Sequence, residues 1–243
     1  MLACACFDTT GQMSSDGLLR VAPLPPLGPN WSLVLDHQIG SPIPDPAGIA
    51  FDGTQLWLMG GGHNAPTHRL VRYDDRNFAI TRDFTFDNLI EVSGTGVYGI
   101  AWDGSYIWIS VSGNRNKLVA VHPDSGQIVR TWASPTILGP SDLSFDSSLM
   151  WIGDGTGTVF SMDVHDGGIK SSFSVASAFV RDNGIVALTD QVLVNGLFQE
   201  GLALFTSTGE LISTNTNVAG PMCIARNQIV TVASSQIIYY ELH

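Results

Sequence analysis

The chain has 243 residues, of which 44% are hydrophobic and only 14% are charged, and its net charge is −11. Apolar residues spread along the whole chain exclude a disordered protein, and two lysines and four glutamates are too few for a long coiled coil. A nucleic acid or an anionic membrane surface is excluded as a partner because no basic face exists, and no apolar run approaches the roughly 18 residues of a transmembrane helix.

The first 30 residues differ from the rest of the chain. Leu2-Ala3-Cys4 followed by a polar stretch resembles the end of a bacterial lipoprotein signal, without the basic start and apolar segment that normally precede it. Lipidation would fall on Cys4 or Cys6, and the alternatives are an unpaired thiol or a strained vicinal pair. Four prolines within residues 17–30 favour an extended linker. We predict a flexible tether or signal remnant over residues 1–30 and an extracytoplasmic protein, which is periplasmic, on the cell surface or secreted.

From Trp31 onward one sequence pattern recurs five times, with a period of about 40 residues. The clearest copies are Gly48–Gly53 with Leu56–Met59, Gly99–Gly104 with Ile107–Ser110, and Asp142–Ser147 with Met150–Gly153. Weaker copies begin at Gly184 and Cys223 and lead into Val192–Asn195 and Ile229–Val232. Short strands at this period are typical of a β-propeller, in which each repeat forms one blade.

Further strands follow within each repeat. Asp-Gly pairs at 52–53 and 103–104 predict tight turns between the first two strands. The predicted third strands are Arg69–Tyr73, Lys117–Val121, Thr158–Met162 and Gly201–Phe205, and the fourth strands include Ala79–Phe84, Ile128–Trp132 and Ile169–Phe173. No stretch has a sustained helical period, so the fold is predicted to be all-β. The repeated Trp57, Trp108 and Trp151 are predicted to pack between neighbouring blades.

The last repeat lacks a fourth strand. Residues 31–36, just before the first repeat, can supply that strand and close the ring, which removes two exposed sheet edges. We therefore predict a five-bladed β-propeller of four-stranded antiparallel blades over residues 31–243. We expect it to be a monomer.

The units Gly-Ile-Ala-Trp-Asp-Gly and Val-His-Pro-Asp-Ser-Gly-Gln-Ile-Val resemble those of propellers related to bacterial glutamine cyclotransferase, and of the streptogramin lyase and NHL-repeat groups. The cyclotransferase resemblance implies five blades and an enzyme that cyclises an amino-terminal glutamine and releases ammonia. Its Phe-Thr-Gln-Gly and Gly-Glu-Gly signatures are absent here. The matching segments read 46–48 Pro-Ala-Gly, 97–99 Val-Tyr-Gly, 140–142 Pro-Ser-Asp and 182–184 Asp-Asn-Gly. The resemblance thus extends to the fold but not to the catalytic residues.

Polar residues are predicted to gather at the propeller face where the chain enters each first strand and leaves each second strand. This channel-face set consists of Asp45, His63, Asn64, Tyr98, Asn114, Arg115, Asp142, Asp154, Asp182, Asn183 and Asn195. Carboxylates brought together there could hold calcium or act as an acid–base pair. The same residue types also cap turns, which is the alternative for each of them. No metal site or other cofactor is predicted; Asp142 and Asp182 are the residues that calcium would use.

The loop from Gly60 to His68 carries three glycines and two histidines, His63 and His68. Two histidines alone are a weak metal signal, so we predict a surface loop with solvated imidazoles. No Gly-x-Ser-x-Gly nucleophile motif occurs, and a catalytic triad is not assigned.

Two classes of function follow from this sequence. The first is a non-catalytic, extracytoplasmic propeller that binds a small molecule, glycan or protein at its channel face. The second is an enzyme of the glutamine cyclotransferase or lyase type that uses aspartates in place of glutamate. We favour the first because the catalytic signatures are missing, and the ligand is not indicated by the residues.

Overall fold

The computed structural model describes residues 12–13, 19–20, 26–61, 67–87, 96–113, 116–133, 136–146, 148–175, 182–196, 201–216, 218 and 220–243. Every regular element in this part of the chain is a β-strand, which confirms the all-β prediction. Among the same residues no helix has the length and apolar character needed to span a membrane.

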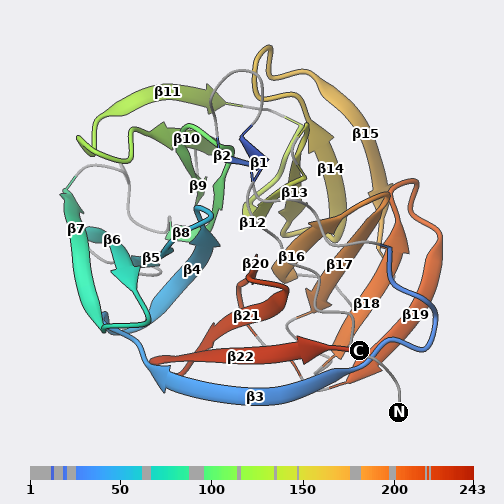
Figure 1. Ribbon diagram of the computed structural model, residues 1–243. Coiled ribbons are helices and arrows are strands. Elements are labelled where there is room, and N and C mark those ends of the chain that lie inside the picture. The colour runs from blue at the N-terminus through green and yellow to red at the C-terminus, as the bar shows by residue number, and fades with distance from the viewer. Residues whose placement is uncertain are drawn as a thin grey trace.

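Five four-stranded antiparallel sheets form the blades of a propeller (Figure 1). Blade 1 contains β4 (Pro46–Phe51), β5 (Leu56–Gly60), β6 (His68–Asp74) and β7 (Ala79–Phe86). Blade 2 contains β8 (Gly96–Trp102), β9 (Ile107–Ser112), β10 (Lys117–Val121) and β11 (Ile128–Ala133). Blade 3 contains β12 (Pro140–Phe145), β13 (Met150–Asp154), β14 (Thr158–Met162) and β15 (Ile169–Ser174). Blade 4 contains β16 (Asp182–Leu188), β17 (Gln191–Gly196), β18 (Gly201–Thr206) and β19 (Leu211–Thr216).

Blade 5 is built from both ends of the described chain. Its strands are β20 (Met222–Ala225), β21 (Gln228–Ala233), β22 (Gln236–Leu242) and β3 (Leu33–Gly40), and β3 lies along β22 in Figure 1. The pairing runs from Leu33 opposite Leu242 to Gly40 opposite Gln236, and reciprocal backbone hydrogen bonds between Ser32 and His243 extend it. The predicted closing strand is thus confirmed, although it begins two residues later than predicted and runs on to Gly40.

Residues just before β3 form hydrogen bonds with blade 4. The side chain of Gln191 accepts a hydrogen bond from the Leu27 N–H and donates one to the Leu27 carbonyl. The buried Trp31 donates from Nε1 to Ser213 Oγ at 2.8 Å. A separate two-stranded sheet pairs β1 (Gln12–Met13) with β2 (Leu19–Arg20).

The repeated aspartate and tryptophan form a local unit in blades 1 to 3. Asp52 Oδ1 accepts hydrogen bonds from the backbone of Thr54 and Gln55, which shapes the turn between the first two strands. Asp52 Oδ2 accepts from Trp57 Nε1 at 2.9 Å. The same carboxylate-to-indole bond joins Asp103 to Trp108 and Asp146 to Trp151. The three indoles are 0–4% exposed and pack in the cores between blades, as predicted.

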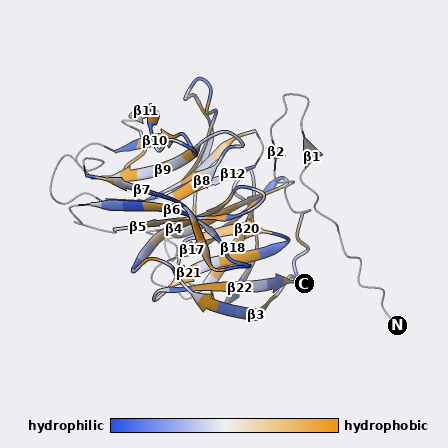
Figure 2. Cartoon of the chain, turned by 60° about the vertical axis from the view of Figure 1, so that its left-hand side comes forward, coloured by the Kyte–Doolittle hydropathy of each residue, from blue (hydrophilic) through white to orange (hydrophobic). Residues whose placement is uncertain are grey.

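Apolar cores fill the seams between neighbouring blades, and Figure 2 shows the hydrophobic stretches along the strands. At three seams an outer-strand aromatic ring also covers a glycine in the next blade. Phe84 lies on Gly126, Trp132 on Gly167, and Phe173 on Gly209, and each glycine has a positive φ. A Cβ on Gly126 would lie 2.5 Å from the Phe84 ring. Glycine is required at these turns both by conformation and by contact.

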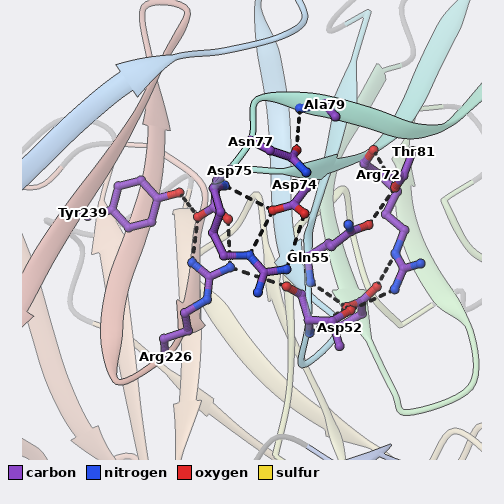
Figure 3. A network of polar contacts seen from close by, with 12 residues as sticks. Asp52, Gln55, Arg72, Asp74, Asp75, Asn77, Ala79, Thr81, Arg226 and Tyr239 are labelled. Atoms are coloured by element: carbon purple, nitrogen blue, oxygen red, sulfur yellow. Dashed lines mark hydrogen bonds and ion pairs between the residues drawn. The ribbon is translucent and has the colours of Figure 1, made fainter.

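The seam between blade 5 and blade 1 carries a polar clasp instead (Figure 3). Asp75, whose side chain is 5% exposed, accepts hydrogen bonds from Arg226 at 2.7 and 2.8 Å and from the Tyr239 hydroxyl at 2.5 Å. Arg226 also lies over the Phe51 ring, 5.2 Å from its centroid. Blade 1 continues the network with the Asp52–Arg72 ion pair. The clasp therefore joins residues 151 positions apart in the chain.

Candidate functional site

The antiparallel order of each blade places the starts of first strands and the ends of second strands at one end of the propeller. We call this end the channel face. Of the predicted residues, Asp45, Tyr98, Asp142, Asp154 and Asn195 have described side chains. His63, Asn64, Asn114, Arg115, Cys4 and Cys6 lie outside the described residues, as do the side chains of Asp182 and Asn183.

The five first strands approach one another closely at the centre of the ring. They contact in the order β4, β8, β12, β16 and β20, and β20 contacts β4 to complete the circle. The approach is tightest where Gly99 of β8 meets β12, since a Cβ on Gly99 would collide with Asp142 Oδ1 and Cα. The first strands of blades 2 and 3 are thus packed closely at the level of Asp142.

This packing buries Asp142 and changes the pKa of its carboxyl group. It is 1% exposed, and its Oδ2 accepts a hydrogen bond from the Ile185 N–H of β16 at 2.9 Å. Its Oδ1 has no hydrogen-bond partner among the described residues and packs on Gly99. Burial raises the pKa of Asp142 to about 8, against the opposing effect of N–H groups of Ile185, Leu143 and Met222. Asp142 therefore carries a proton at neutral pH.

The other described residues of the channel-face set do not join Asp142. Asp154 is 1% exposed, and its Oδ1 accepts from the Thr156 N–H, the Thr156 hydroxyl and the Thr158 N–H, which is the turn-capping role. Asp45 is exposed, in a left-handed conformation with φ of 44°. Tyr98 is half-buried on β8 beside Gly96. The three described aspartates thus occupy three different environments.

Asn195 and two serines add buried polar atoms to this end. Asn195 donates from Nδ2 to the Gly220 carbonyl at 3.3 Å, and its buried Oδ1 has no partner in the described part of the chain. Ser110 Oγ accepts from the Gly99 N–H at 2.8 Å and donates to the Ser141 carbonyl at 2.9 Å. The buried Ser141 Oγ is also without a partner among these residues. The sequence analysis did not single out either serine. Their hydrogen bond joins blade 2 to blade 3, and the repeat pattern gives no information on contacts between blades.

His68 contradicts the predicted solvated loop. It is 1% exposed as the first residue of β6, and neither ring nitrogen has a hydrogen-bond partner that meets normal geometry among the described residues. Burial lowers the pKa of His68, and the nearby Gly60 carbonyl opposes that shift in part. The imidazole is therefore neutral at neutral pH. The strand begins one residue earlier than the sequence predicts, which carries His68 from the loop into the sheet.

The described residues contain no group of three or more His, Cys, Asp or Glu side chains placed to hold a metal ion. Cys223 on β20 is a free thiol, half-buried, and burial is the main cause that raises its pKa. A thiol with a raised pKa is a poor nucleophile at neutral pH. Calcium at Asp142 and Asp182, which the sequence leaves possible, is not tested by the structure, because the side chain of Asp182 lies outside the described residues.

No family model matches this chain, and no curated protein matches it in sequence. Among solved structures it is similar to glutaminyl cyclase from Myxococcus xanthus, with a TM-score of 0.70 and 10% identity over 86% of this chain and 96% of that one. It also aligns with apo AztD from Citrobacter koseri, with a TM-score of 0.43 and 15% identity over 73% of this chain and 48% of that one. The match to the cyclase establishes a shared propeller fold and supports the resemblance seen in the repeats.

Proposed function

We propose that this protein is a non-catalytic propeller that binds a small molecule, glycan or protein segment at its channel face. The supporting observation is that the described carboxylates have different environments. Asp154 caps a turn, Asp45 is exposed, and Asp142 is buried against Gly99. An acid–base pair needs two groups exposed to one substrate, and only Asp45 among these three is exposed.

The unpartnered acceptors at this end favour a ligand that brings hydrogen-bond donors. Asn195 Oδ1 and Ser141 Oγ are buried without partners among the described residues, on the second strand of blade 4 and the first strand of blade 3. A buried acceptor without a donor costs about 1–3 kcal/mol, which a ligand N–H or O–H would recover. Amines, amides and sugar hydroxyls are therefore the expected contact groups.

A ligand panel tests this proposal. Free amino acids, short peptides and oligosaccharides would be screened by thermal shift against the wild type, an Asn195→Ala variant and an Asp124→Asn variant. Asp124 lies in an exposed turn at the opposite end of the propeller and serves as the control. We expect at least one compound to stabilise the wild type and the control but not Asn195→Ala. The proposal fails if every stabilising compound acts equally on all three proteins.

A glutaminyl cyclase-like enzyme is the second candidate. It is favoured by the shared fold and by Asp142, since a carboxyl group protonated at neutral pH is in the form that a general acid requires. The test is ammonia release from a peptide with amino-terminal glutamine, with Asp142→Asn as the variant. Release by the wild type that is lost in the variant would establish the enzyme and overturn the binding proposal. No release would remove this candidate.

The acidic composition and scarce lysine support an extracytoplasmic location, and the Leu-Ala-Cys start supports a lipid anchor. The extracytoplasmic location and the lipid anchor are both part of the proposal. Cell fractionation of the expressed chain tests the first, and incorporation of labelled palmitate into the wild type but not a Cys4→Ser/Cys6→Ser variant tests the second.

A further inference from the structure

The rings that cover glycine turns occupy one position of the blade. Each ring lies on the fourth strand, opposite a third-strand residue that comes two residues before the bulge, in the pairs Leu70–Phe84, Leu118–Trp132 and Val159–Phe173. In blade 4 this register places Asn215 opposite Leu202, and the bulge again follows two residues later. The outer strand of blade 4 therefore carries an amide where blades 1 to 3 carry an aromatic ring.

Blade 5 explains the missing ring, because it has no glycine turn for a ring to cover. In blades 1 to 4 a short turn joins the end of the third strand to the start of the fourth. In blade 5 the end of β22 and the start of β3 are paired, with Leu242 opposite Leu33, but no turn joins them, since β3 precedes blade 1 in the chain. This end of the β3–β22 ladder lacks the connection that holds the two strands of a hairpin together at little cost in loop entropy.

Residues just before β3 occupy the seam between blades 4 and 5 instead. Trp31 is 6% exposed and belongs to the same apolar core as Leu204 of blade 4 and Ile229 of blade 5. Its carbonyl accepts a hydrogen bond from Asn215 Nδ2 at 3.1 Å, and its Nε1 donates to Ser213 Oγ at 2.8 Å. The amide at the ring position thus binds the segment that brings an aromatic ring to this seam.

We call residues 27–31 the latch. Its first residue is held by the buried side chain of Gln191, which accepts a hydrogen bond from the Leu27 N–H at 2.6 Å and donates one to the Leu27 carbonyl at 3.0 Å. From Ser32 onward the chain pairs with blade 5. The latch is thus bonded to blade 4, and the strand that follows it directly is bonded to blade 5.

We infer that the latch controls the opening of blade 5: β3 stays paired with β22 while Trp31 is docked on blade 4, and it separates before the hairpins of blades 1 to 4 open when Trp31 leaves. A docked Trp31 fixes the end of the ladder that no turn closes. Segments held by few contacts open locally at lower free energy than the core. The described hydrogen bonds from the latch to blade 4 involve the side chains of Gln191, Ser213 and Asn215. This conformational device goes beyond the proposed function and does not depend on it.

Native-state hydrogen exchange of the full chain, read by mass spectrometry of peptic peptides, tests this inference. The variants are Trp31→Ala, Trp31→Phe and Asn215→Ala. Trp132→Ala is the matched control, because it removes the same kind of side chain from the ring position at the seam between blades 2 and 3. The decisive peptides cover Leu33–Gly40 and Gln236–Leu242, and peptides of β9 and β10 report on blade 2.

We expect Trp31→Ala to raise the exchange rate of β3 and β22 at least tenfold and to leave β9 and β10 unchanged. Asn215→Ala should raise exchange in the same two strands, although it lies on blade 4, and Trp31→Phe, which keeps a ring, should raise it less than threefold. Trp132→Ala should leave β3 and β22 unchanged. Equal acceleration of blades 2 and 5 in Trp31→Ala, or unchanged exchange of β3 and β22, would overturn the inference. If Trp31→Ala does not fold, Asn215→Ala decides by the same comparison of blades 5 and 2.

Discussion

The seams from blade 1 to blade 4 and the closing seam between blades 5 and 1 are stabilised by different contacts. At the seams from blade 1 to blade 4, an aromatic ring of one outer strand rests on a glycine turn of the next blade. At the seam from blade 5 to blade 1, Ile39 takes the place of the ring, Phe78 takes the place of the glycine, and the Asp75–Arg226–Tyr239 clasp provides the connection. Every seam has an apolar core; three regular seams add a ring on a glycine, and the closing seam adds an ion pair with a buried carboxylate.

The difference follows from how each seam forms. A ring on a glycine is a close contact between consecutive repeats, and it depends on glycine keeping the turn open. An ion pair with a buried carboxylate is directional, and it penalises wrong partners because an unpaired buried charge is costly. A specific polar contact therefore suits the one seam that must join chain segments far apart in sequence.

The largest effect is expected from filling a glycine turn. In Gly167→Ala the new Cβ would collide with the Trp132 ring, and φ is 72° at this position. Overpacking together with the left-handed backbone should lower the free energy of unfolding by about 3 kcal/mol. Thermal or urea unfolding measures this loss. Phe78→Ala at the equivalent turn is the control, and an equal loss there would remove the distinction between the seams.

Replacing Asp142 should stabilise the protein at alkaline pH. Its pKa is 3.8 when unfolded and about 8 when folded, so the folded state keeps its proton while the unfolded state loses it, and wild-type stability falls as the pH rises through this window. An asparagine side chain cannot ionise, so Asp142→Asn should gain on the order of 3 kcal/mol over the wild type by pH 6 and flatten the profile. Urea unfolding from pH 4 to 8 measures both. A variant profile parallel to that of the wild type would contradict this prediction.

The clasp should show the opposite pH dependence. Burial alone would raise the pKa of Asp75, but hydrogen bonds from Arg226 and Tyr239 outweigh it and hold the pKa below 3.8. A lowered pKa contributes stability above 3.8 that is lost as the pH falls through the folded value. Asp75→Asn should therefore cost about 2 kcal/mol at neutral pH and less in acid. Asp74→Asn, beside the exposed Arg76, is the control and should cost less; equal losses would argue against the clasp.

The smallest effect is expected at Phe78. Phe78→Gly removes a side chain that is 64% exposed and relieves a left-handed conformation, so stability should rise by up to about 1 kcal/mol. The melting temperature records the change. A clear decrease would mean that the ring is packed in solution, and it would bring this turn closer to the glycine turns of the other blades.

The sequence predicts those parts of the fold that depend on repetition. Trp57, Trp108 and Trp151 mark equivalent strands, and the third strands Lys117–Val121 and Thr158–Met162 have the predicted limits. The closing strand is also predictable, because the last repeat lacks a fourth strand. Contacts between blades are not predictable in this way. The Ser110–Ser141 bond and the Asp75–Arg226 pair join positions that the repeat does not relate.

Part of the candidate site could have been inferred from the repeat alignment. Asp142 stands where Gly48, Gly99 and Gly184 stand in other repeats, and a charged residue in place of a tightly packed glycine signals an unusual environment. His68 gave no such signal, because the polar loop that precedes it in sequence hides the start of the strand at His68. Asp154 resembled a ligand in sequence because turn-capping and cation-binding draw on the same residue types.

The pairing of β3 with β22 has a consequence for how the protein is made. Leu33 leaves the ribosome long before Leu242, so the first strand of the propeller has no partner until nearly all of the described chain has been synthesised. Contacts of such high sequence separation slow folding and leave an unpaired edge available to other chains meanwhile. Blades 1 to 4 can each form from local sequence as translation proceeds. Completion of the ring therefore follows the synthesis of blades 1 to 4, and the nascent chain depends on Leu33–Gly40 remaining unaggregated until then.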